Sequence, residues 1–467
     1  MSMILENCSY WMGKLILQIS FIKSLTGNLW KRNHLYSRLA NGIFWSFTGS
    51  IIAQGMSLLA TVPVARLLGA KGYGELGIIQ STMMTFVILS GLSLGDTASK
   101  YLAELRGRDK VRTGKVLGIT SITGFVVSAL LGLIFYISAP YLASRVLNAP
   151  HLSRSLQIAA FALFFNGVNG AQIGALSGFE RFDLITIVNV WKGILSLPLM
   201  IIGAWTWGVE GTTLALLVVA FITVIITWRM LRNAMQREGI VIHYRESISE
   251  WHILPSFYFP TVLSSLVVII AIWAGNALLV NQRNGYVEMG IFNAANQWRM
   301  AIQFLPAIIA RPVLPILSNL YGENAIDDFK KALRLNLALA FTTALVPALF
   351  VILASKWIMQ AYGPAFSHGS GALVILALTT VLSSTIAIVG TAISSIGKRW
   401  HATWLNFLWA IVFLVACLRL VQFGSMGLAF TYMVSYFVHL ITSGTYTVVV
   451  LRPMFKSTVS KHSITID

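Results

Sequence analysis

Long apolar segments dominate this sequence and constrain its fold more than any other feature. An α-helix needs about 20 mostly apolar residues to cross the hydrocarbon core of a membrane. Twelve segments of the chain meet this requirement: residues 40–66, 75–102, 115–138, 154–178, 184–206, 211–231, 254–280, 288–315, 332–355, 370–396, 401–420 and 426–450. The pattern predicts an all-α integral membrane protein with twelve transmembrane helices.

The composition argues against a soluble domain. Hydrophobic residues make up 56% of the chain and charged residues only 11%, whereas soluble domains carry roughly 25% charged residues. The net charge of +18 could suit nucleic acid, but cytoplasmic loops of membrane proteins also collect Lys and Arg. We therefore expect no nucleic-acid partner. The two cysteines, Cys8 and Cys417, provide neither a disulfide framework nor a thiolate metal site, and we expect no cofactor and no metal.

Lys and Arg are divided unevenly between the two sides of the predicted membrane segments. Threading the chain through twelve spans puts 25 of them on the side of the N-terminus and 7 on the other side. Loops rich in Lys and Arg remain in the cytoplasm. Both termini are therefore predicted to be cytoplasmic.

A short motif occurs twice at a long interval. Residues 72–78 read GYGELGI and residues 285–291 read GYVEMGI, an offset of 213 residues. Further pairs at similar offsets are Gly208 with Gly424, Gly211 with Gly427, and Gly178 with Gly397. A fixed long period indicates a repeated structural unit. The repeat predicts two parallel six-helix lobes, which in transporters are related by an axis along the membrane normal and enclose the substrate site at their interface.

The predicted organisation follows from the repeat and the charges. It comprises residues 1–38 as a cytoplasmic amphipathic extension, 39–232 as the N-lobe, 233–252 as a cytoplasmic linker, 253–451 as the C-lobe and 452–467 as a cytoplasmic tail. An overlong start remains an alternative for the first 38 residues. The repeated motif is interpreted as structural, because glycine suits a turn, glutamate a helix N-terminus and tyrosine the membrane interface.

Ionisable residues inside the spans are candidates for function, because the membrane interior penalises them by several kcal/mol. Arg299 lies 11 residues into its span, about 16 Å along the helix axis. Lys192 lies near mid-depth in another span. Each belongs to a polar stripe at helical spacing: Asn293, Asn296, Arg299 and Gln303 on one helix, and Thr186, Asn189, Lys192 and Ser196 on the other.

These stripes predict an anion site in a central cavity. Arg299, Lys192, Asn296, Asn189 and Gln303 are its expected residues, since the planar guanidinium of arginine suits phosphate or carboxylate. A packing arginine bonded to backbone carbonyls is the alternative. The only acidic residue inside a span, Asp96, is the candidate for ion coupling. Its spacing from Lys100 also allows a simple ion pair.

The sequence resembles the polysaccharide-biosynthesis flippases of the multidrug and oligosaccharidyl-lipid exporter superfamily. The resemblance rests on "ANGIFWSFTGSIIAQGMSLLATVPVARLLGAKGYGELGIIQS" (40–81), "LSLGDTASKYLAEL" (92–105) and "ALSGFERFD" (175–183). It implies a MATE-like fold with twelve spans around a cationic central cavity. It also implies that the protein moves undecaprenyl-pyrophosphate-linked sugar repeat units from the cytoplasmic to the periplasmic leaflet of the bacterial inner membrane. Arg299 and Lys192 correspond to the family's cavity cations by position only.

The chain is expected to be a monomer, with a lipid-linked oligosaccharide and membrane lipids as its partners. An H⁺ or Na⁺ gradient and a glycan polymerase or chain-length machinery are further possible partners. An ion-coupled drug or small-molecule antiporter of the same superfamily is the alternative function, and it would need deep acidic residues. A glycan polymerase or glycosyltransferase is disfavoured, because the long outer connection at 139–153 carries no acid. No Gly-Lys-Ser/Thr phosphate loop is present, and an enzyme is not expected.

Overall fold

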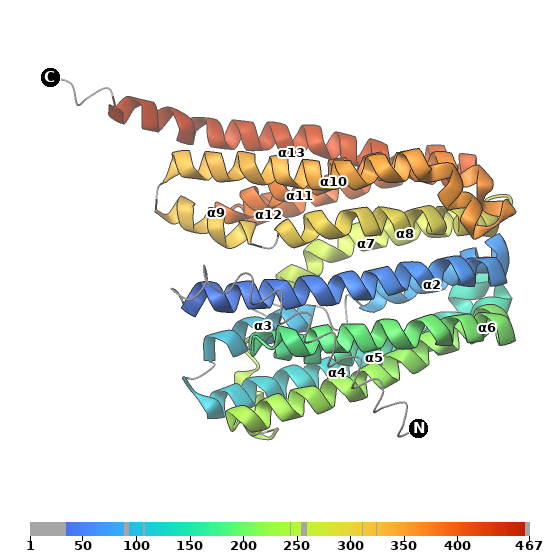
Figure 1. Cartoon of the computed structure of the whole chain (residues 1–467), viewed down its shortest axis with the longest axis horizontal. Coiled ribbons are helices and arrows are strands. Elements are labelled where there is room, and N and C mark those ends of the chain that lie inside the picture. Colours follow the sequence, from blue (N-terminus) through green and yellow to red (C-terminus); the bar gives the residue numbers. More distant parts are fainter. Residues whose placement is uncertain are drawn as a thin grey trace, which may run out of the picture.

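The computed structural model describes residues 34–87, 93–105, 108–242, 244–253, 259–310, 312–323 and 325–462. Most of the predicted extension at 1–38 and the last residues of the predicted tail lie outside this part. All regular secondary structure in the described residues is helical. The long helices run roughly parallel to one another in a single bundle (Figure 1).

Twelve membrane-crossing passes can be counted in this bundle. The long helices are α2 (His34–Val87), α3 (Ser93–Leu105), α4 (Lys110–Tyr141), α5 (Ser153–Gly178), α6 (Phe182–Glu238), α7 (Phe259–Val280), α8 (Gly285–Ala310), α9 (Val313–Gly322), α10 (Ile326–Tyr362), α11 (Ser370–Ser395), α12 (Arg399–Leu420) and α13 (Gly424–His462). The short ones are η2 (Leu142–Val146), η3 (Pro150–Leu152), η4 (Glu246–Glu250), η6 (Pro364–Gly369) and η7 (Val421–Phe423). The part of α2 after Gly69 and α3 together form one pass, and α8 and α9 together form another.

Two of the long helices are hairpins. The chain in α2 leaves helical geometry at Gly69, and the chain in α6 does so at Trp207 and Gly208. A Cβ atom placed on Gly203 would lie 2.4 Å from the carbonyl oxygen of Gly211. Residues eight apart in a straight helix would be about 12 Å apart. The α6 chain therefore reverses direction, and Figure 1 shows the same reversal in α2.

These reversals reconcile the helix count with the sequence. Eight segments of the described chain are long and apolar enough to cross a membrane, and Leu266–Val280 is a shorter apolar helix. Three of the eight contain a reversal: Ile51–Val87, Phe182–Glu238 and Trp400–Val449. Counting those twice and adding the short helix gives the predicted twelve passes.

The repeat is visible in the backbone itself. Residues with positive φ recur at offsets of 215 to 217: Gly69 with Asn284, Asn148 with Gly363, Glu180 with Gly397, and Gly208 with Gly424. Each pair marks the same turn in the two halves. The predicted pairing of Gly208 with Gly424 thus matches in conformation, whereas Gly397 pairs with Glu180 rather than with Gly178. The sequence comparison missed this because a left-handed turn can be occupied by glycine in one half and by another residue in the other.

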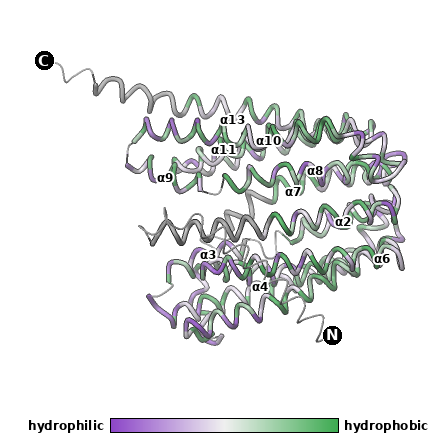
Figure 2. The backbone as a smooth tube through the Cα atoms, in the orientation of Figure 1, coloured by the Kyte–Doolittle hydropathy of each residue, from purple (hydrophilic) through white to green (hydrophobic). Residues whose placement is uncertain are grey.

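The turns that connect the helices of both lobes gather at the same two ends of the bundle. The reversal at Gly69 and the turns at η2–η3, at 281–284 and at η6 lie at one end of the bundle, which we call the hairpin end. Residues 108–109, η4 and the start of α10 lie at the other, which we call the linker end. Figure 2 shows hydrophobic segments along the helices and hydrophilic segments gathered towards their ends.

The outer faces of the bundle are apolar. On α10, the side chains of Val346, Phe350 and Leu353 lie on one helical face and are 69%, 70% and 78% exposed. Such a large exposed apolar surface is unfavourable in water. It indicates contact with lipid, in agreement with the predicted membrane fold.

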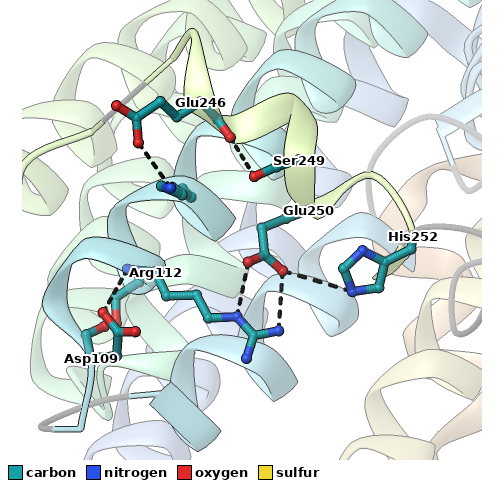
Figure 3. A network of polar contacts seen from close by, with 8 residues as sticks. Asp109, Arg112, Glu246, Ser249, Glu250 and His252 are labelled. Atoms are coloured by element: carbon teal, nitrogen blue, oxygen red, sulfur yellow. Dashed lines mark hydrogen bonds and ion pairs between the residues drawn. The ribbon is translucent and has the colours of Figure 1, made fainter.

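The linker is fastened to the N-lobe. The carboxylate of Glu250, in η4, accepts two hydrogen bonds from the guanidinium of Arg112, at 2.9 and 3.2 Å. Glu246 lies 2.8 Å from the ammonium of Lys115. Arg112 belongs to the first turn of α4, whose N-terminus is capped by Asp109 (Figure 3). Since a two-point carboxylate–guanidinium contact fixes orientation, η4 is oriented relative to the N-lobe.

Candidate transport cavity

A cavity of about 660 Å³ lies within the N-lobe. It is lined by the two arms of α2 and by α3, α5 and α6, with one residue from the C-lobe, Gln297 of α8. Its polar lining consists of amides, hydroxyls and two charged groups: Gln54, Ser57, Thr61, Tyr73, Gln80, Asp96, Ser99, Asn166, Asn169, Ser177, Asn189, Lys192, Ser196 and Gln297. A membrane helix bundle has no structural need for so many facing polar groups, which makes this space the candidate site.

The two charged residues of the cavity come from different helices. Lys192 lies 10 residues inside the start of α6, and Asp96 lies 9 residues from the end of α3. Both starting points are at the linker end, so each charge is about 15 Å deep along its helix. The Lys100 ammonium lies over the Tyr101 ring, 4.8 Å from its centroid.

A close helix crossing brings Asp96 to this position. A Cβ atom on Gly174 would lie 2.1 Å from the carbonyl oxygen of Gly95. Only glycine permits such an approach of two backbones. The crossing sets α3 directly against α5, where Ser99 donates a 3.1 Å hydrogen bond to Ser177.

Two asparagines of α5 are held in fixed orientations. The side-chain amide of Asn166 donates to the carbonyl of Ala162 at 2.8 Å. That of Asn169 donates to the hydroxyl of Thr227 at 2.8 Å. These bonds lower the entropic cost of presenting amides to a bound molecule.

Arg299 lies apart from this cavity. Residues 297 and 299 are about 200° apart around α8, and Gln297 is the one that lines the cavity. The Arg299 Nε donates to Asn296 at 2.6 Å, and its Nη1 donates to Gln303 at 3.3 Å. Its guanidinium carbon lies 5.4 Å from the centroid of the Tyr432 ring. Three members of the predicted stripe, Asn296, Arg299 and Gln303, thus form a bonded row on α8, with Arg299 against Tyr432 of α13. The fourth, Asn293, lies against Gly77 of α2 instead.

The surroundings of Arg299 are aromatic. Tyr432 contacts Phe413 and Phe292, with ring centroids 5.0 and 5.8 Å away. Trp409 stacks on Phe413 at 5.0 Å. All four rings are buried. The C-lobe interior at this position is filled by side chains, with Arg299 at its margin and only partly buried.

The structure separates the predicted site residues into two groups. Lys192, Asn189 and Asp96 line the N-lobe cavity. Arg299, Asn296 and Gln303 form the hydrogen-bonded row on α8. The two groups do not share one lining in this structure. The reason is that α8 borders the cavity with the nearly opposite face, that of Gln297, and sequence spacing alone does not orient the helix about its axis.

Several lining residues were missed from the sequence although their spacing was visible. Gln54, Ser57 and Thr61 recur at intervals of 3 and 4 on α2, and Asn166, Asn169 and Ser177 share one side of α5. Neither of these two rows contains a charged residue, so the spacing of their polar side chains was the only signal in the sequence. In the described ranges, no three His, Cys, Asp or Glu side chains gather closely enough to hold a metal ion.

Comparison with proteins of solved structure supports the architecture. An inward-facing multidrug resistance MATE family transporter of the MOP superfamily is 18% identical to this chain and superposes with a TM-score of 0.72. The alignment covers 88% of this chain and 99% of the transporter. An outward-facing structure of such a transporter gives 0.63, with 18% identity and coverage of 91% and 98%. A MOP superfamily transporter from Pyrococcus furiosus gives 0.62, with 18% identity and coverage of 87% and 95%. At such identities the likeness concerns the fold alone.

Sequence comparison adds the family. The chain is 19% identical over 392 residues to the EPS I polysaccharide export inner membrane protein EpsE of Ralstonia nicotianae, which covers 81% of this chain and 87% of that protein. The EpsE protein of Ralstonia solanacearum gives the same identity and coverage. The family described as "Polysaccharide biosynthesis protein" matches residues 39–321, which is more than half of the chain. With its twelve passes and MATE-like lobes, this chain belongs to the polysaccharide biosynthesis protein family.

Proposed function

We propose that this protein is a flippase that moves undecaprenyl-pyrophosphate-linked oligosaccharide repeat units from the cytoplasmic to the periplasmic leaflet of the inner membrane, for surface polysaccharide biosynthesis. The observation that carries the proposal is the N-lobe cavity, in which amides and hydroxyls surround Lys192 deep inside an apolar bundle. The family match and the name of the Ralstonia relative support a glycan as the cargo.

The cavity chemistry suits the two polar parts of such a cargo. Amide and hydroxyl groups such as Asn166, Asn169 and Gln80 can exchange hydrogen bonds with sugar hydroxyls. Lys192 would attract the pyrophosphate, aided by Asn189. The polyprenyl chain would remain in the bilayer, because the hydrocarbon core already provides it with an apolar surrounding.

Arg299, Asn296 and Gln303 are proposed as a second anion site on α8. The Arg299 guanidinium uses two of its N–H groups for Asn296 and Gln303 and has five in total. Its remaining donors could bind the pyrophosphate once the lobes rearrange. This part of the proposal requires movement of α8 relative to the N-lobe.

The orientation proposed here has the linker end in the cytoplasm. It rests on the 25-to-7 division of Lys and Arg and on the tendency of basic loops to remain inside. The TM-score is 0.72 with the inward-facing transporter and 0.63 with the outward-facing one. The higher value for the inward-facing structure supports a cavity that faces the cytoplasm. Reporter fusions after residue 242 and at residue 462 should both be cytoplasmic, and a periplasmic result at either site would refute the orientation.

Ion-coupled antiport of a small cationic molecule is the second candidate. The specific observation in its favour is Asp96, an acid that lines the cavity together with Lys192. Such a carboxylate could also bind H⁺ or Na⁺ as a coupling ion for glycan transport. We expect the protein to act without covalent chemistry of its own, alongside polymerase or chain-length machinery.

The test is a chromosomal deletion complemented by the wild-type chain. Cells without the protein should lose surface polysaccharide and accumulate the lipid-linked repeat unit in the inner membrane. Wild-type protein should restore export, whereas drug resistance should be unaffected. Normal surface polysaccharide in the deletion strain would exclude the flippase, and increased drug sensitivity there would favour the antiporter.

A further inference from the structure

The duplicated motif meets itself across the lobe interface. A Cβ atom on Gly74 would lie 1.8 Å from the carbonyl oxygen of Tyr286, and one on Gly290 would lie 2.0 Å from that of Ala70. The second arm of α2 and the start of α8 therefore cross with their backbones in contact. Only residues without a side chain allow this distance. Both glycines lie within or directly beside copies of the motif, at the hairpin end.

Each of the two motif tyrosines contacts the opposite lobe. Tyr73 of the N-lobe packs against Tyr362 and Phe366 of the C-lobe, with ring centroids 6.4 and 6.1 Å away. Tyr286 of the C-lobe donates a 2.6 Å hydrogen bond to the carbonyl of Leu147 in the N-lobe. Each tyrosine thus contacts the turn between the third and fourth passes of the opposite lobe. This reciprocity makes the contact a single two-fold unit.

Further hydrogen bonds surround this unit. Those that join described residues of opposite lobes all lie in the hairpin half of the bundle: Thr61–Tyr362 at 2.9 Å, Arg66–Ala361 at 2.7 Å, Trp273–Thr82 at 3.0 Å, Asn276–Ser81 at 2.8 Å, Asn281–Val146 at 2.7 Å and Asn148–Asn281. The lobes are therefore bonded to each other at one end.

One chain of hydrogen bonds links this contact to the cavity. The Thr61 hydroxyl donates to the carbonyl of Leu58 at 2.6 Å, so it accepts from the hydroxyl of Tyr362. Tyr362 in turn accepts from the indole N–H of Trp298 at 3.2 Å. Thr61 and Tyr73 both line the cavity. A hydroxyl-rich molecule in the cavity can compete with Tyr362 for Thr61, since buried hydroxyls exchange partners rather than remain unpaired.

We propose that residues 70–78 and 285–293, the two motif copies with their flanking residues, form the gate at the hairpin end, and that a polyhydroxylated cargo weakens it from inside by displacing the Tyr362–Thr61 hydrogen bond. The cargo class rests on the proposed function; the gate does not. Release of cargo at the hairpin end requires the Gly74–Gly290 crossing to separate. The motif is repeated because each lobe supplies half of one symmetric closure.

The first test measures the gate without any cargo. In a chain whose native Cys8 and Cys417 are replaced, Ser57→Cys places a single thiol in the cavity. Gly74→Leu should force the lobes apart at the hairpin end, since overpacking a tight contact is unfavourable. Labelling of that thiol by a membrane-impermeant maleimide from the hairpin side should rise by at least about tenfold. The labelling rate is proportional to the fraction of molecules with an open gate, and the substitution should increase that fraction. Gly55→Leu is the matched control, because a Cβ atom there meets nothing within 4 Å.

The second test locks the gate. The Cβ position of Gly77 lies 3.3 Å from the Cβ atom of Asn293, close to the spacing of a disulfide. Oxidising Gly77→Cys/Asn293→Cys should abolish hairpin-side labelling and glycan export, and reduction should restore both. The control pair Gly124→Cys/Ala171→Cys lies within one lobe at 3.0 Å and should leave both unchanged.

The outcomes separate the two proposals. Unchanged labelling in Gly74→Leu at normal abundance, or hairpin-side labelling that persists in the oxidised lock, would overturn the gate. Should Gly74→Leu fail to accumulate, the oxidised lock decides alone. Gated labelling in cells whose surface glycan does not depend on the protein would leave the gate standing and refute the proposed cargo.

Discussion

The two lobes are built on one repeat but their interiors differ. In the N-lobe, α2, α3, α5 and α6 surround a cavity whose lining includes Lys192, Asp96 and several amides and hydroxyls. In the C-lobe, the space beside Arg299 is filled by the buried rings of Tyr432, Phe413 and Trp409. Paired turns show that the backbones match, so the difference lies in the side chains. The duplicated scaffold thus keeps its helix geometry, while the described residues line a cavity in the N-lobe and place buried aromatic rings beside Arg299 in the C-lobe.

The comparison assigns different tasks to the two halves. A hollow polar interior can bind a hydrated head group, whereas an aromatic interior can act as a rigid body. In the N-lobe, Lys192 lines open space, whereas Arg299 already has Asn296 and Gln303 as partners. If the N-lobe carries the cargo, substitutions there should reduce transport without reducing protein abundance. Substitutions in the C-lobe interior should affect abundance more.

The largest effect is expected at Lys192. Lys192→Ala should lower glycan export by about tenfold to a hundredfold, because a hydrogen bond to a charged group contributes roughly 1.5–3 kcal/mol. Lys192→Arg should retain part of the activity. The measurement is surface polysaccharide divided by membrane abundance of the variant. Lys331→Ala, at an exposed lysine of the linker end, is the control, and equal export by both variants would remove Lys192 from the site.

The next effect concerns Arg299 and is the sharpest test of the comparison. If Arg299 is an anion ligand, the Arg299→Ala variant should lose export at normal abundance. The Arg299→Lys variant should retain a fraction of export, because lysine keeps the charge but not the planar fork. As a packing residue beside Tyr432, it should instead lower abundance while export per molecule stays constant. Normal abundance together with normal export in Arg299→Ala would contradict the anion-site proposal.

A smaller effect is expected at Asp96. Asp96→Asn removes the only acidic side chain among the described residues that line the cavity. If Asp96 binds a coupling ion, transport should slow by several-fold and lose its dependence on the ion gradient, measured in vesicles with and without an imposed gradient. An Asp96→Asn protein that still responds fully to the gradient would exclude the coupling role. Recovery on exchanging Asp96 and Lys100 would instead indicate a structural pair.

The smallest effect is expected at the linker. Glu250→Gln weakens the contact with Arg112 (Figure 3), whose side chain is 47% exposed. Because the Arg112 end of the pair is open to solvent whereas Glu250 is only 11% exposed, the contact is expected to contribute about 1 kcal/mol. The Tm of the purified protein should fall by a few degrees at most, with a smaller difference at high salt. A Tm that does not change at low salt would show that the linker is not held to the N-lobe by this pair.

The sequence predicts the fold well because the membrane restricts it so strongly. Twelve apolar segments and the 215-residue repeat lead to two lobes, since a spanning helix must satisfy its backbone hydrogen bonds internally. The depth of Lys192 could also be predicted. The partners of Arg299 could not, because the rotation of α8 about its axis decides whether Gln297 or Arg299 borders the cavity, and residue spacing does not give that rotation. The role of the repeated motif as a contact between lobes was also missed, since a sequence does not show which glycines meet.

The central claim is that a lipid-linked oligosaccharide crosses the membrane through the N-lobe cavity. Purified protein reconstituted into liposomes with a labelled lipid-linked oligosaccharide tests it directly, with a membrane-impermeant glycosidase reporting the leaflet of the sugar. We predict that wild-type protein exposes the inner-leaflet substrate to the enzyme, and that Lys192→Ala slows this exposure by at least about tenfold. Equal rates for wild-type protein, Lys192→Ala and protein-free liposomes would contradict the account.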